Sequence, residues 1–458
     1  MLTATLVDHV LDTPFEAFPA HVVEDGRLRL IDALSCTVGG ARVPSNLAAL
    51  GLARSAGGNP QATVLLHGDR LPLATTAMLN ALNCRAFDFE VTGPEAEGAN
   101  AGKMVGHVCS TTEPTAFSVA EHVRASGKEL LAAVILGGDI GARIAVADRF
   151  EFDKCFEVCG TANAFGAAAL AGRLLGANHD QLHNAFGILV NMIGGSFQSL
   201  WDGVDTFKLP GALAAQNAVT AVQMAMAGFT GIREPLESPQ GYFALFGNNP
   251  TPANAALDLG TLYYSKGMHK LHPSCYGIHN PMECALEIVR NNTIDPAAIE
   301  RVTLDVPPNR IKHFLNQPMH ATDAQPRALF SIPFGVANVL LRGSSEIEHY
   351  TEGFIHQPEL IALTEKVTLV PSLPMDVGNH AGTLTVYMKD GTSFSASREV
   401  PLGWAENPVG PEMVRDKYWR NLSFAGSIPN DNASHALDLL ERLESVDDVS
   451  EIAALLVA

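Results

Sequence analysis

Stretches rich in alanine, leucine and glycine, with apolar residues every three to four positions, fill the chain up to about residue 250. The stretches 45–57, 76–89, 113–127 and 128–150 follow this spacing, which predicts amphipathic helices. The stretch 160–177, GTANAFGAAALAGRLLGA, has so much glycine and alanine that we expect its backbone to pack closely against a neighbouring helix. The pattern predicts a large, all-helical domain.

The pattern changes near residue 260. The stretches 299–307 and 383–400 alternate apolar and polar residues, and KDGTS in the second indicates a hairpin turn. Helical spacing returns at 281–292 and 327–343, and again in the tail 432–458. The predicted fold class is therefore mostly α, with a large all-helical domain and a smaller α+β lid domain. We expect the helical domain at 1–259, the lid at 260–400, and C-terminal helices at 401–458 that return to the helical domain.

The overall charge restricts the partners of this chain. Asp and Glu outnumber Lys and Arg by 49 to 30, which gives a net charge of −19 and argues against nucleic acid or an anionic membrane surface. No basic leader precedes an apolar run, and no long apolar run without charges or breakers predicts a membrane span. The 7 cysteines are odd in number and scattered, as in reduced cytosolic proteins, so we expect a cytoplasmic location.

Standard catalytic signatures are missing from the sequence. It has no Gly-x-Gly-x-x-Gly after a strand, no Walker loop, no Gly-x-Ser-x-Gly and no His-Glu-x-x-His. Cys155 and Cys159 have the wrong spacing for a zinc knuckle, and buried thiols are the favoured interpretation. The chemistry must therefore be sought in less familiar groupings.

Two neighbouring segments in the first half combine acids with a lysine and a histidine. Asp88, Glu90 and Thr92 lie where a predicted helix ends and a glycine-rich loop begins, and acids at a helix C-terminus oppose the helix dipole, which is an unusual structural choice. Lys103 and His107 lie on a glycine-containing loop just before the next helix, whose positive N-terminus suits a bound carboxylate. A solvated loop is the alternative for both segments.

Two further segments carry isolated cations. Lys208 lies between apolar neighbours ahead of a Pro-Gly helix start, which gives it a reason for a lowered pKa or for pairing with an anion. The stretch 269–279, HKLHPSCYGIH, leaves open a metal site, a cysteine nucleophile, acid–base chemistry with anion binding, or a structural role. Its spacing fits no zinc template and no carboxylate lies next to it to orient a histidine ligand.

These segments, in this order, resemble the MmgE/PrpD family, which includes 2-methylcitrate dehydratase, cis-aconitate decarboxylase and iminodisuccinate epimerase. The matching stretches include ALNCRAFDFEVT, GHVCSTTEPTAFSVAEH, DGVDTFKLPGALAA, KLHPSCYGIH and ALFSIPFGVANVLLRG, and the likeness runs from about residue 20 to 400. The resemblance implies a homodimer, a cleft between a helical domain and an α+β lid, and no metal or organic cofactor.

Carried over residue by residue, the resemblance points to a set of matching positions: Asp88, Thr92, His107, Lys208, Lys270, Cys275 and His279. Three departures stand out. Glu157 falls where the family has a histidine, the loop between Thr92 and His107 carries the acidic insert GPEAEGAN, and the Lys-Pro-Gly segment lacks the usual histidine. A less anionic substrate than that of the named relatives is one reading of these changes.

The resemblance implies proton abstraction or decarboxylation next to a carboxylate of a small di- or tricarboxylate. We expect Lys208, Lys270 and His107 to bind the substrate and stabilise developing charge, with His107 or His279 as proton carrier and Asp88 as orienting group. Further substrate contacts are expected from five residues: Thr92, Lys103, Glu157, Cys275 and Tyr276. An epimerase or isomerase is the alternative enzyme, and a non-catalytic carboxylate-binding dimer is the alternative outside enzymes.

Overall fold

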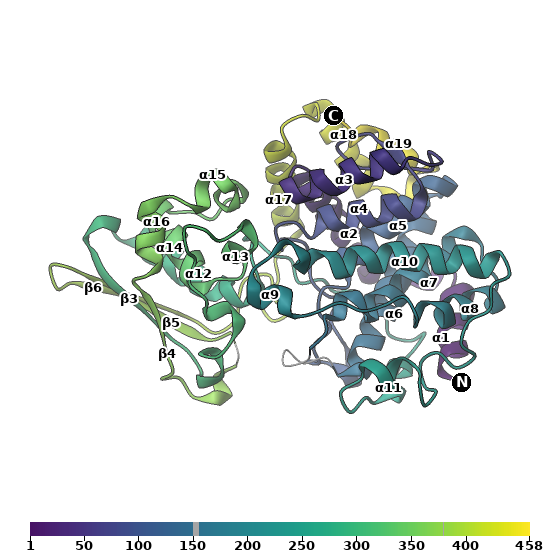
Figure 1. Ribbon diagram of the computed structural model, residues 1–458, viewed down its shortest axis with the longest axis horizontal. Helices are drawn as coiled ribbons and strands as arrows, with labels where there is room; N and C mark the ends of the chain where they lie inside the picture. Colours follow the sequence, from purple (N-terminus) through teal and green to yellow (C-terminus); the bar gives the residue numbers. More distant parts are fainter. Residues whose placement is uncertain (150–154, 379) are drawn as a thin grey trace.

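Two bodies of different secondary structure lie side by side (Figure 1). The structure is a computed structural model that describes residues 1–149, 155–378 and 380–458. The larger body is built of helices and contains both ends of the chain, whereas the smaller body is built around a sheet. This arrangement confirms the predicted fold class, a large helical domain with a smaller α+β domain.

Most helices of the larger body fall where the apolar spacing predicted them. Their bounds are α1 (Leu2–Asp12), α2 (Ala20–Gly40), α3 (Pro44–Ala56), α4 (Leu73–Cys84), α5 (Cys109–Val123), α6 (Gly127–Asp148), α7 (Ala162–Leu175), α8 (His179–Leu189), α9 (Gln198–Asp202), α10 (Leu209–Met226) and α11 (Tyr242–Phe246). The prediction that this part is all-helical needs one correction. The strands β1 (Ala62–Thr63) and β2 (Arg70–Leu71) pair antiparallel, and two residues each are too short to show an alternating pattern.

The helices α6 and α7 form the close contact that the small residues predicted. A Cβ atom on Gly166 of α7 would lie 2.4 Å from the backbone oxygen of Gly137 and 3.1 Å from Cα of Gly141, both on α6. Two segments, Gly127–Asp148 and Val158–Leu175, have the length and hydropathy of a membrane span, but 100 % and 83 % of their apolar windows are buried inside the protein. Burial of this extent is typical of the core helices of a globular body.

The smaller body is a four-stranded sheet covered by short helices. Its strands are β3 (Ile299–Asp305), β4 (Val367–Val370), β5 (Gly382–Met388) and β6 (Ser393–Arg398), in the order β4-β3-β5-β6. Its helices are α12 (His279–Asn291), α13 (Gln325–Leu329), α14 (Ile332–Arg342), α15 (Glu352–Ile355) and α16 (Pro358–Thr364). The predicted hairpin is present as β5 and β6, which pair antiparallel, whereas β4 pairs parallel to β3.

One helix predicted in the smaller body is in fact two. The stretch 327–343 was expected to form a single helix, but the chain leaves helical geometry between α13 and α14. The hydroxyl of Ser331 accepts a hydrogen bond from the backbone N–H of Phe334 at 3.1 Å and so caps the start of α14, and Pro333 lies in its first turn. Both features favour a new helix start over continuation.

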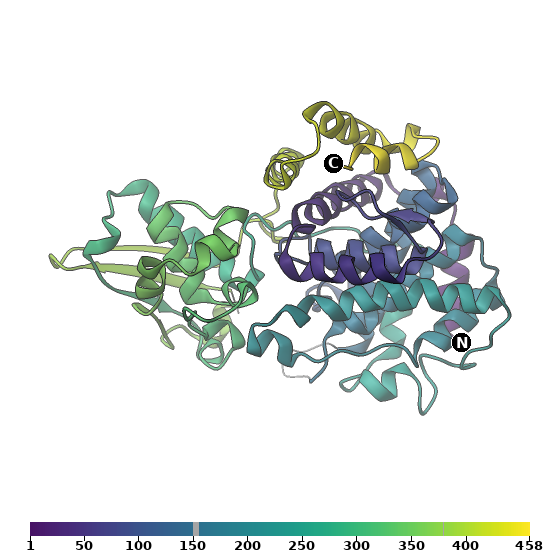
Figure 2. The same cartoon turned by 45° about the horizontal axis from the view of Figure 1, so that its top comes forward.

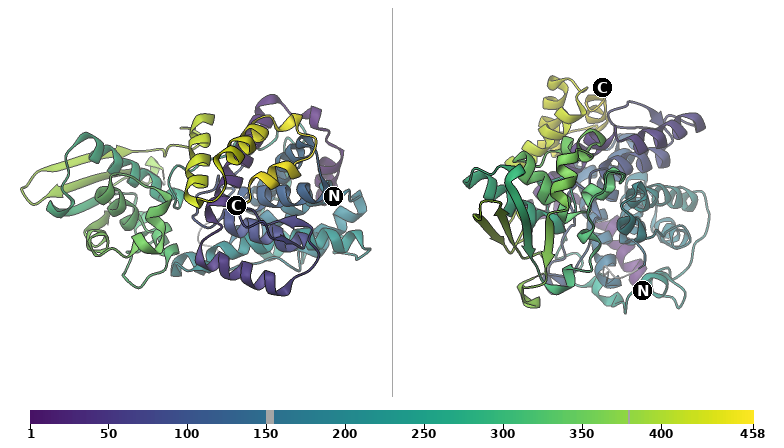
Figure 3. Two further views of the ribbon diagram at one scale, coloured as in Figure 1. Left: turned by 90° about the horizontal axis from the view of Figure 1, so that it is seen from above. Right: turned by 60° about the vertical axis from the view of Figure 1, so that its left-hand side comes forward.

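The chain ends by returning to the larger body. The helices α17 (Pro411–Ala425), α18 (Asn430–Glu441) and α19 (Ser450–Leu455) lie against the first helices, as Figures 2 and 3 show in yellow beside purple. The side-chain amide of Asn421 on α17 donates to the hydroxyl of Ser35 on α2 at 2.9 Å. The smaller body is therefore inserted between two parts of the helical one.

Candidate active site

A buried arginine connects three acidic and basic side chains at the end of α4. Arg85 follows the last residue of that helix, and its Nη1 contacts the carboxylate of Asp88, Oε1 of Glu90 at 2.6 Å and Nδ1 of His107 at 2.6 Å. The cation at the helix C-terminus offsets the carboxylates that oppose the helix dipole. We call Arg85, Asp88, Glu90 and His107 the arginine cluster.

The loop between Thr92 and His107 closes on itself, which brings the histidine to the acids. The N–H of Gly93 donates to the backbone oxygen of Gly106 at 2.9 Å, and Gly93 forms a bridge with His107. Gly93 has φ +99, a conformation that side chains rarely adopt, so glycine is needed at this closure. Gly93 and His107 are thus adjacent in space, although they are 14 positions apart in the sequence.

Lys270 joins the arginine cluster from the other side. Thr92 and Met268 exchange two backbone hydrogen bonds of 3.0 Å, which lays residues 268–270 against residues 88–92. The ammonium group of Lys270 donates to the backbone oxygen of Asp88 at 2.6 Å and lies 3.1 Å from its carboxylate. Lys270 and Asp88 are both fully buried, so the pair acts in a low-dielectric surrounding.

The surroundings keep His107 uncharged and Glu90 charged. Burial, Arg85 and Lys270 lower the pKa of His107, although Asp88 and Glu90 oppose that shift. Burial works to raise the pKa of Glu90, but Arg85, His107 and Lys270 outweigh it and hold that pKa well below its usual value. Nδ1 of a neutral His107 either accepts from Arg85 or donates to Glu90 at 2.8 Å, because one nitrogen cannot do both.

His107 is also the member of the arginine cluster that solvent reaches. Its side chain is 20 % exposed, whereas those of Arg85, Asp88 and Glu90 are at most 4 % exposed. Its backbone oxygen accepts from the side-chain amide of Asn163 at 2.7 Å, which fixes the loop against α7. A neutral, partly exposed imidazole beside buried ions can exchange a proton with a small molecule at the surface of the cluster.

Several buried polar atoms near the arginine cluster have no hydrogen-bond partner among the described residues. They are Nε of Arg85, Oε2 of Glu90, Oγ1 of Thr92 and Oε2 of Glu157. Buried polar groups are nearly always paired in folded proteins. Their gathering here is typical of a site that binds a polar ligand.

Glu157 lies within electrostatic reach of this site. It is 4 % exposed and precedes the short 3-10 helix Val158–Gly160, whose Cys159 N–H it accepts through Oε1 at a long 3.5 Å. Burial raises the pKa of Glu157, Arg85 opposes the shift, and Asp88 adds to it. The carboxyl group predicted to contact substrate is therefore held near Arg85 and biased towards its protonated form.

The two other predicted lysines make their hydrogen bonds to residues outside the arginine cluster. Lys208 is 2 % exposed, and its ammonium group donates to Ser45 at 2.8 Å and to Asp205 at 3.2 Å. Burial lowers the pKa of Lys208, as its apolar neighbours predicted, and the adjacent Phe207 ring faces Arg85 at 5.7 Å. Lys103 is exposed and donates to Asn100 at 2.6 Å.

The remaining predicted residues, Cys275, Tyr276 and His279, lie close to Lys270. Burial and the nearby Asp88 raise the pKa of the Cys275 thiol, which therefore stays uncharged. The hydroxyl of Tyr276 donates to the backbone oxygen of His269 at 3.0 Å, and its ring stacks on His279 at 4.7 Å. His279 is fully buried, and burial holds its pKa well below the usual value.

Two groups of side chains have the composition of a metal site. The donor atoms of Asp88, Glu90 and His107 lie within 4.8 Å of one another, but Arg85 already contacts all three. That arrangement favours a guanidinium over a metal ion at this position. The sequence alternative of a metal at 269–279 gains no such cluster among the described residues.

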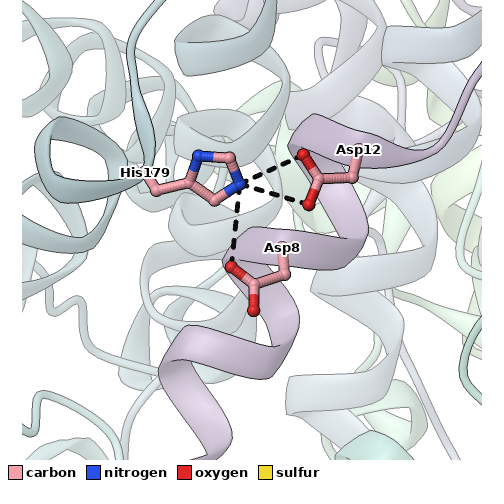
Figure 4. A group of neighbouring side chains, drawn as sticks. All are labelled: Asp8, Asp12 and His179. Atoms are coloured by element: carbon pink, nitrogen blue, oxygen red, sulfur yellow. Dashed lines mark hydrogen bonds and ion pairs between the residues drawn. The ribbon is translucent and has the colours of Figure 1, made fainter.

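The second group is on the surface and joins α1 to α8 (Figure 4). Nε2 of His179 lies 3.1 Å from Oδ1 of Asp12 and 3.7 Å from Oδ1 of Asp8, and the three side chains are 50 to 65 % exposed. Exposed ion pairs of this kind contribute about 0–1 kcal/mol.

The helical body with its inserted α+β body holds a neutral histidine among buried cations and carboxylates, an arrangement typical of enzymes that transfer protons. Residues 4–255 match the family model of the MmgE/PrpD N-terminal domain, and residues 272–444 match that of the MmgE/PrpD C-terminal domain. The chain belongs to the MmgE/PrpD family, which confirms the resemblance seen in the sequence and its assignment as an enzyme.

Curated relatives match over almost their whole length. The cis-aconitate decarboxylase-like protein oryM of Aspergillus oryzae is 25 % identical over 485 residues, covering 99 % of this chain and 97 % of the relative. The cis-aconitate decarboxylase of Aspergillus terreus is 25 % identical over 472 residues, covering 96 % and 92 %. That of Mus musculus is 24 % identical over 412 residues, covering 87 % and 81 %.

Sequence reasoning did not assign a role to Arg85 and left Glu90 out of the expected site. The signal was present in CRAFDFE, where one basic residue precedes two acids at positions 88 and 90. Nothing in that spacing shows that the guanidinium turns back to meet both acids. The left-handed conformation of Asp88, with φ +46, makes this possible.

Proposed function

We propose that this chain is a lyase that removes CO2 or a proton from a carbon next to a carboxylate of a small di- or tricarboxylate. The observation that carries the proposal is the neutral His107, which lies next to Arg85, Glu90 and the buried ammonium of Lys270. The relatives named as cis-aconitate decarboxylases support decarboxylation as the first reaction to test.

Each member of the site has a role in this proposal. When CO2 or a proton leaves, the electron pair remains on carbon and spreads into the adjacent carboxylate as an enolate-like charge. A proton added to that carbon completes a decarboxylation, whereas departure of a hydroxyl from the neighbouring carbon, protonated as water, completes a dehydration. Arg85 and Lys270 stabilise that charge. His107 gives or takes the proton, since its imidazole is uncharged and reaches solvent. Asp88 holds Lys270 and Arg85 in position.

In this proposal Glu157 limits the charge that the substrate can carry near Arg85. An ionised carboxylate near Arg85 repels a substrate carboxylate, whereas a protonated one donates a hydrogen bond. We expect the part of the substrate near Glu157 to be an uncharged or protonated group, such as a hydroxyl or a carboxylic acid. A substrate with fewer charges than a tricarboxylate fits this arrangement.

The other expected contacts take secondary roles. We propose that Lys208 attracts a second carboxylate at the edge of the site, and that Thr92 supplies its free Oγ1. Cys275 lies close to Lys270, Tyr276 and His279 support the Lys270 segment, and Lys103 acts from the surface. A homodimer, a cytoplasmic location and independence of cofactors remain part of the proposal. Light scattering on the purified protein tests the dimer.

Proton NMR in D2O on a panel that includes cis-aconitate, 2-methylcitrate and smaller dicarboxylates tests the reaction. We expect loss of CO2 or of water from one substrate, and we expect this turnover to fall by about a hundredfold or more in His107→Gln. Deuterium exchange into unreacted substrate without elimination would replace the proposal with an epimerase or isomerase. Binding without any turnover across the panel would replace it with a carboxylate-binding protein.

A further inference from the structure

A second buried charge group lies behind the arginine cluster and joins three distant parts of the chain. Asp32 on α2, Lys417 on α17 and His269 are all 6 % exposed or less. The ammonium of Lys417 donates to Oδ1 and Oδ2 of Asp32 at 3.0 and 2.8 Å, and Nδ1 of His269 contacts Oδ2 at 3.0 Å. We call Asp32, Lys417 and His269 the rear anchor.

The rear anchor also holds the backbone that carries the acids of the arginine cluster. Lys417 donates to the backbone oxygen of Phe89, and Oδ1 of Asp32 accepts from the N–H of Val91 at 2.9 Å. The Lys417 ammonium lies 4.1 Å from the centre of the Phe89 ring, a cation–π contact. All three hydrogens of the ammonium are therefore used, two on Asp32 and one on Phe89.

The arginine cluster and the rear anchor contact alternate residues of the segments 88–91 and 269–270. Phe89 contacts the rear anchor through its backbone oxygen and Val91 through its backbone N–H, and His269 is itself a member through its imidazole. Residues 88, 90 and 270 face Arg85 and His107. Because residues 89, 91 and 269 are covalently joined to residues 88, 90 and 270, fixing the first set from behind restricts the positions of the second.

The charge state of the rear anchor agrees with its geometry. Burial works to raise the pKa of Asp32, but Lys417 and His269 outweigh it and hold that pKa below its usual value. An ionised carboxylate accepts only, so both Nδ1 of His269 and the N–H of Val91 donate to it.

We propose that Asp32 and Lys417 are positioning residues for this enzyme, which fix residues 88–91 and 268–270 so that Asp88, Glu90 and Lys270 meet around Arg85 and His107. Neither touches substrate; they act through the two backbone segments. The C-terminal helix α17 thereby takes part in the reaction, although it contributes no catalytic residue. The activity readout rests on the proposed function, but the backbone readout does not.

The test removes the rear anchor without leaving a buried charge. Lys417→Met alone strands the Asp32 carboxylate, which can prevent folding. Asp32→Leu/Lys417→Met instead replaces both charged side chains by apolar groups of similar shape, so that no charge is stranded, although the N–H of Val91, the backbone oxygen of Phe89 and Nδ1 of His269 lose a partner. Arg415→Ala is the matched control, since it lies on the same helix and pairs with Glu441 at the surface.

Hydrogen–deuterium exchange by mass spectrometry gives the readout that does not depend on substrate. In the double variant we expect amide exchange at Val91, Thr92 and Met268 to rise about tenfold or more, because the Val91 N–H loses its acceptor and the bridge between Thr92 and Met268 loses its support. Exchange in the α6 core and in the Arg415→Ala control stays as in the parent protein. Unchanged exchange at the three amides would overturn the proposal, whatever the activity.

Kinetics on the same variants separate positioning from general stability. We expect kcat to fall about tenfold or more with little change in KM, because displaced catalytic groups slow the chemical step. The acid limb of the pH profile should also move to higher pH, because Lys270 lowers the pKa of His107 and is no longer held beside it. Raised exchange with unchanged kcat overturns the positioning role. If the parent protein turns over no substrate, the proposed function is wrong, and the exchange result alone then tests whether Asp32 and Lys417 position the two backbone segments.

Discussion

Lys270 donates to the backbone oxygen of Asp88 at 2.6 Å and lies 3.1 Å from its carboxylate, although the two residues are 182 positions apart. This pair joins the helical body to the segment that leads into the α+β body. It also holds Asp88 in its left-handed conformation next to Arg85. The relationship therefore fixes the site and the junction of the two bodies together.

Lys270→Met is expected to lower kcat/KM by about tenfold to a hundredfold, because the cation that stabilises developing charge is lost. It should also lower the free energy of unfolding by about 1–3 kcal/mol, since the buried Asp88 loses one cationic partner and keeps Arg85. Urea denaturation and steady-state kinetics measure the two effects. The double variant Lys270→Met/Asp88→Asn should recover stability and stay inactive, and recovered activity would remove Lys270 from the mechanism.

His107→Gln is expected to lower kcat/KM by about a hundredfold or more, because glutamine keeps a polar contact but exchanges no proton. In the parent protein the lowered pKa of His107 means that the imidazole stays neutral as pH falls below its ordinary value of about 6.5. The acid limb of kcat/KM should lie below that pH. His435→Gln, an exposed change on α18, is the control. An acid limb above pH 6.5 would contradict this environment for His107.

Glu157→Gln is expected to stabilise the protein at alkaline pH more than at acid pH. The raised pKa of Glu157 means that its protonated form contributes stability below the unfolded value of about 4.3, and that this contribution is lost as pH rises through the folded pKa. Glutamine resembles the protonated form at every pH. Denaturation at pH 4.5 and 8 measures the difference. An equal effect at both pH values would mean that folding does not raise the pKa of Glu157.

His279→Gln is expected to reduce the loss of stability in acid. The folded pKa of this buried histidine lies well below its unfolded value, so its contribution is present above about pH 6.5 and is lost as pH falls. One such group adds a slope of up to about 1.4 kcal/mol per pH unit. Unfolding free energies between pH 7 and 5 measure the slope, with His435→Gln as control. A loss of kcat larger than the loss of folded protein would return His279 to the catalytic residues.

Several helices could be predicted from sequence because they follow from local spacing, and so could the close packing of residues 160–177 against a neighbouring helix, although not that its partner is α6. The short strand β4 and the break at Ser331 depend on neighbours and a single cap, which periodicity does not reveal. In the site, the resemblance pointed to Asp88, His107 and Lys270. The role of Arg85 depends on a turn of the backbone, and that of Lys417 on a partner 385 positions away.

The return of α17 to α2 makes the helical body a discontinuous domain. Asp32 meets its cation only after the whole inserted body has left the ribosome, since Lys417 follows it by 385 positions. In the first 259 residues alone, Asp32 would lack its cationic partner, and the surface that α17 covers would be exposed. Co-translational folding therefore completes the larger domain last, and a fragment that stops before α17 should be a client of chaperones.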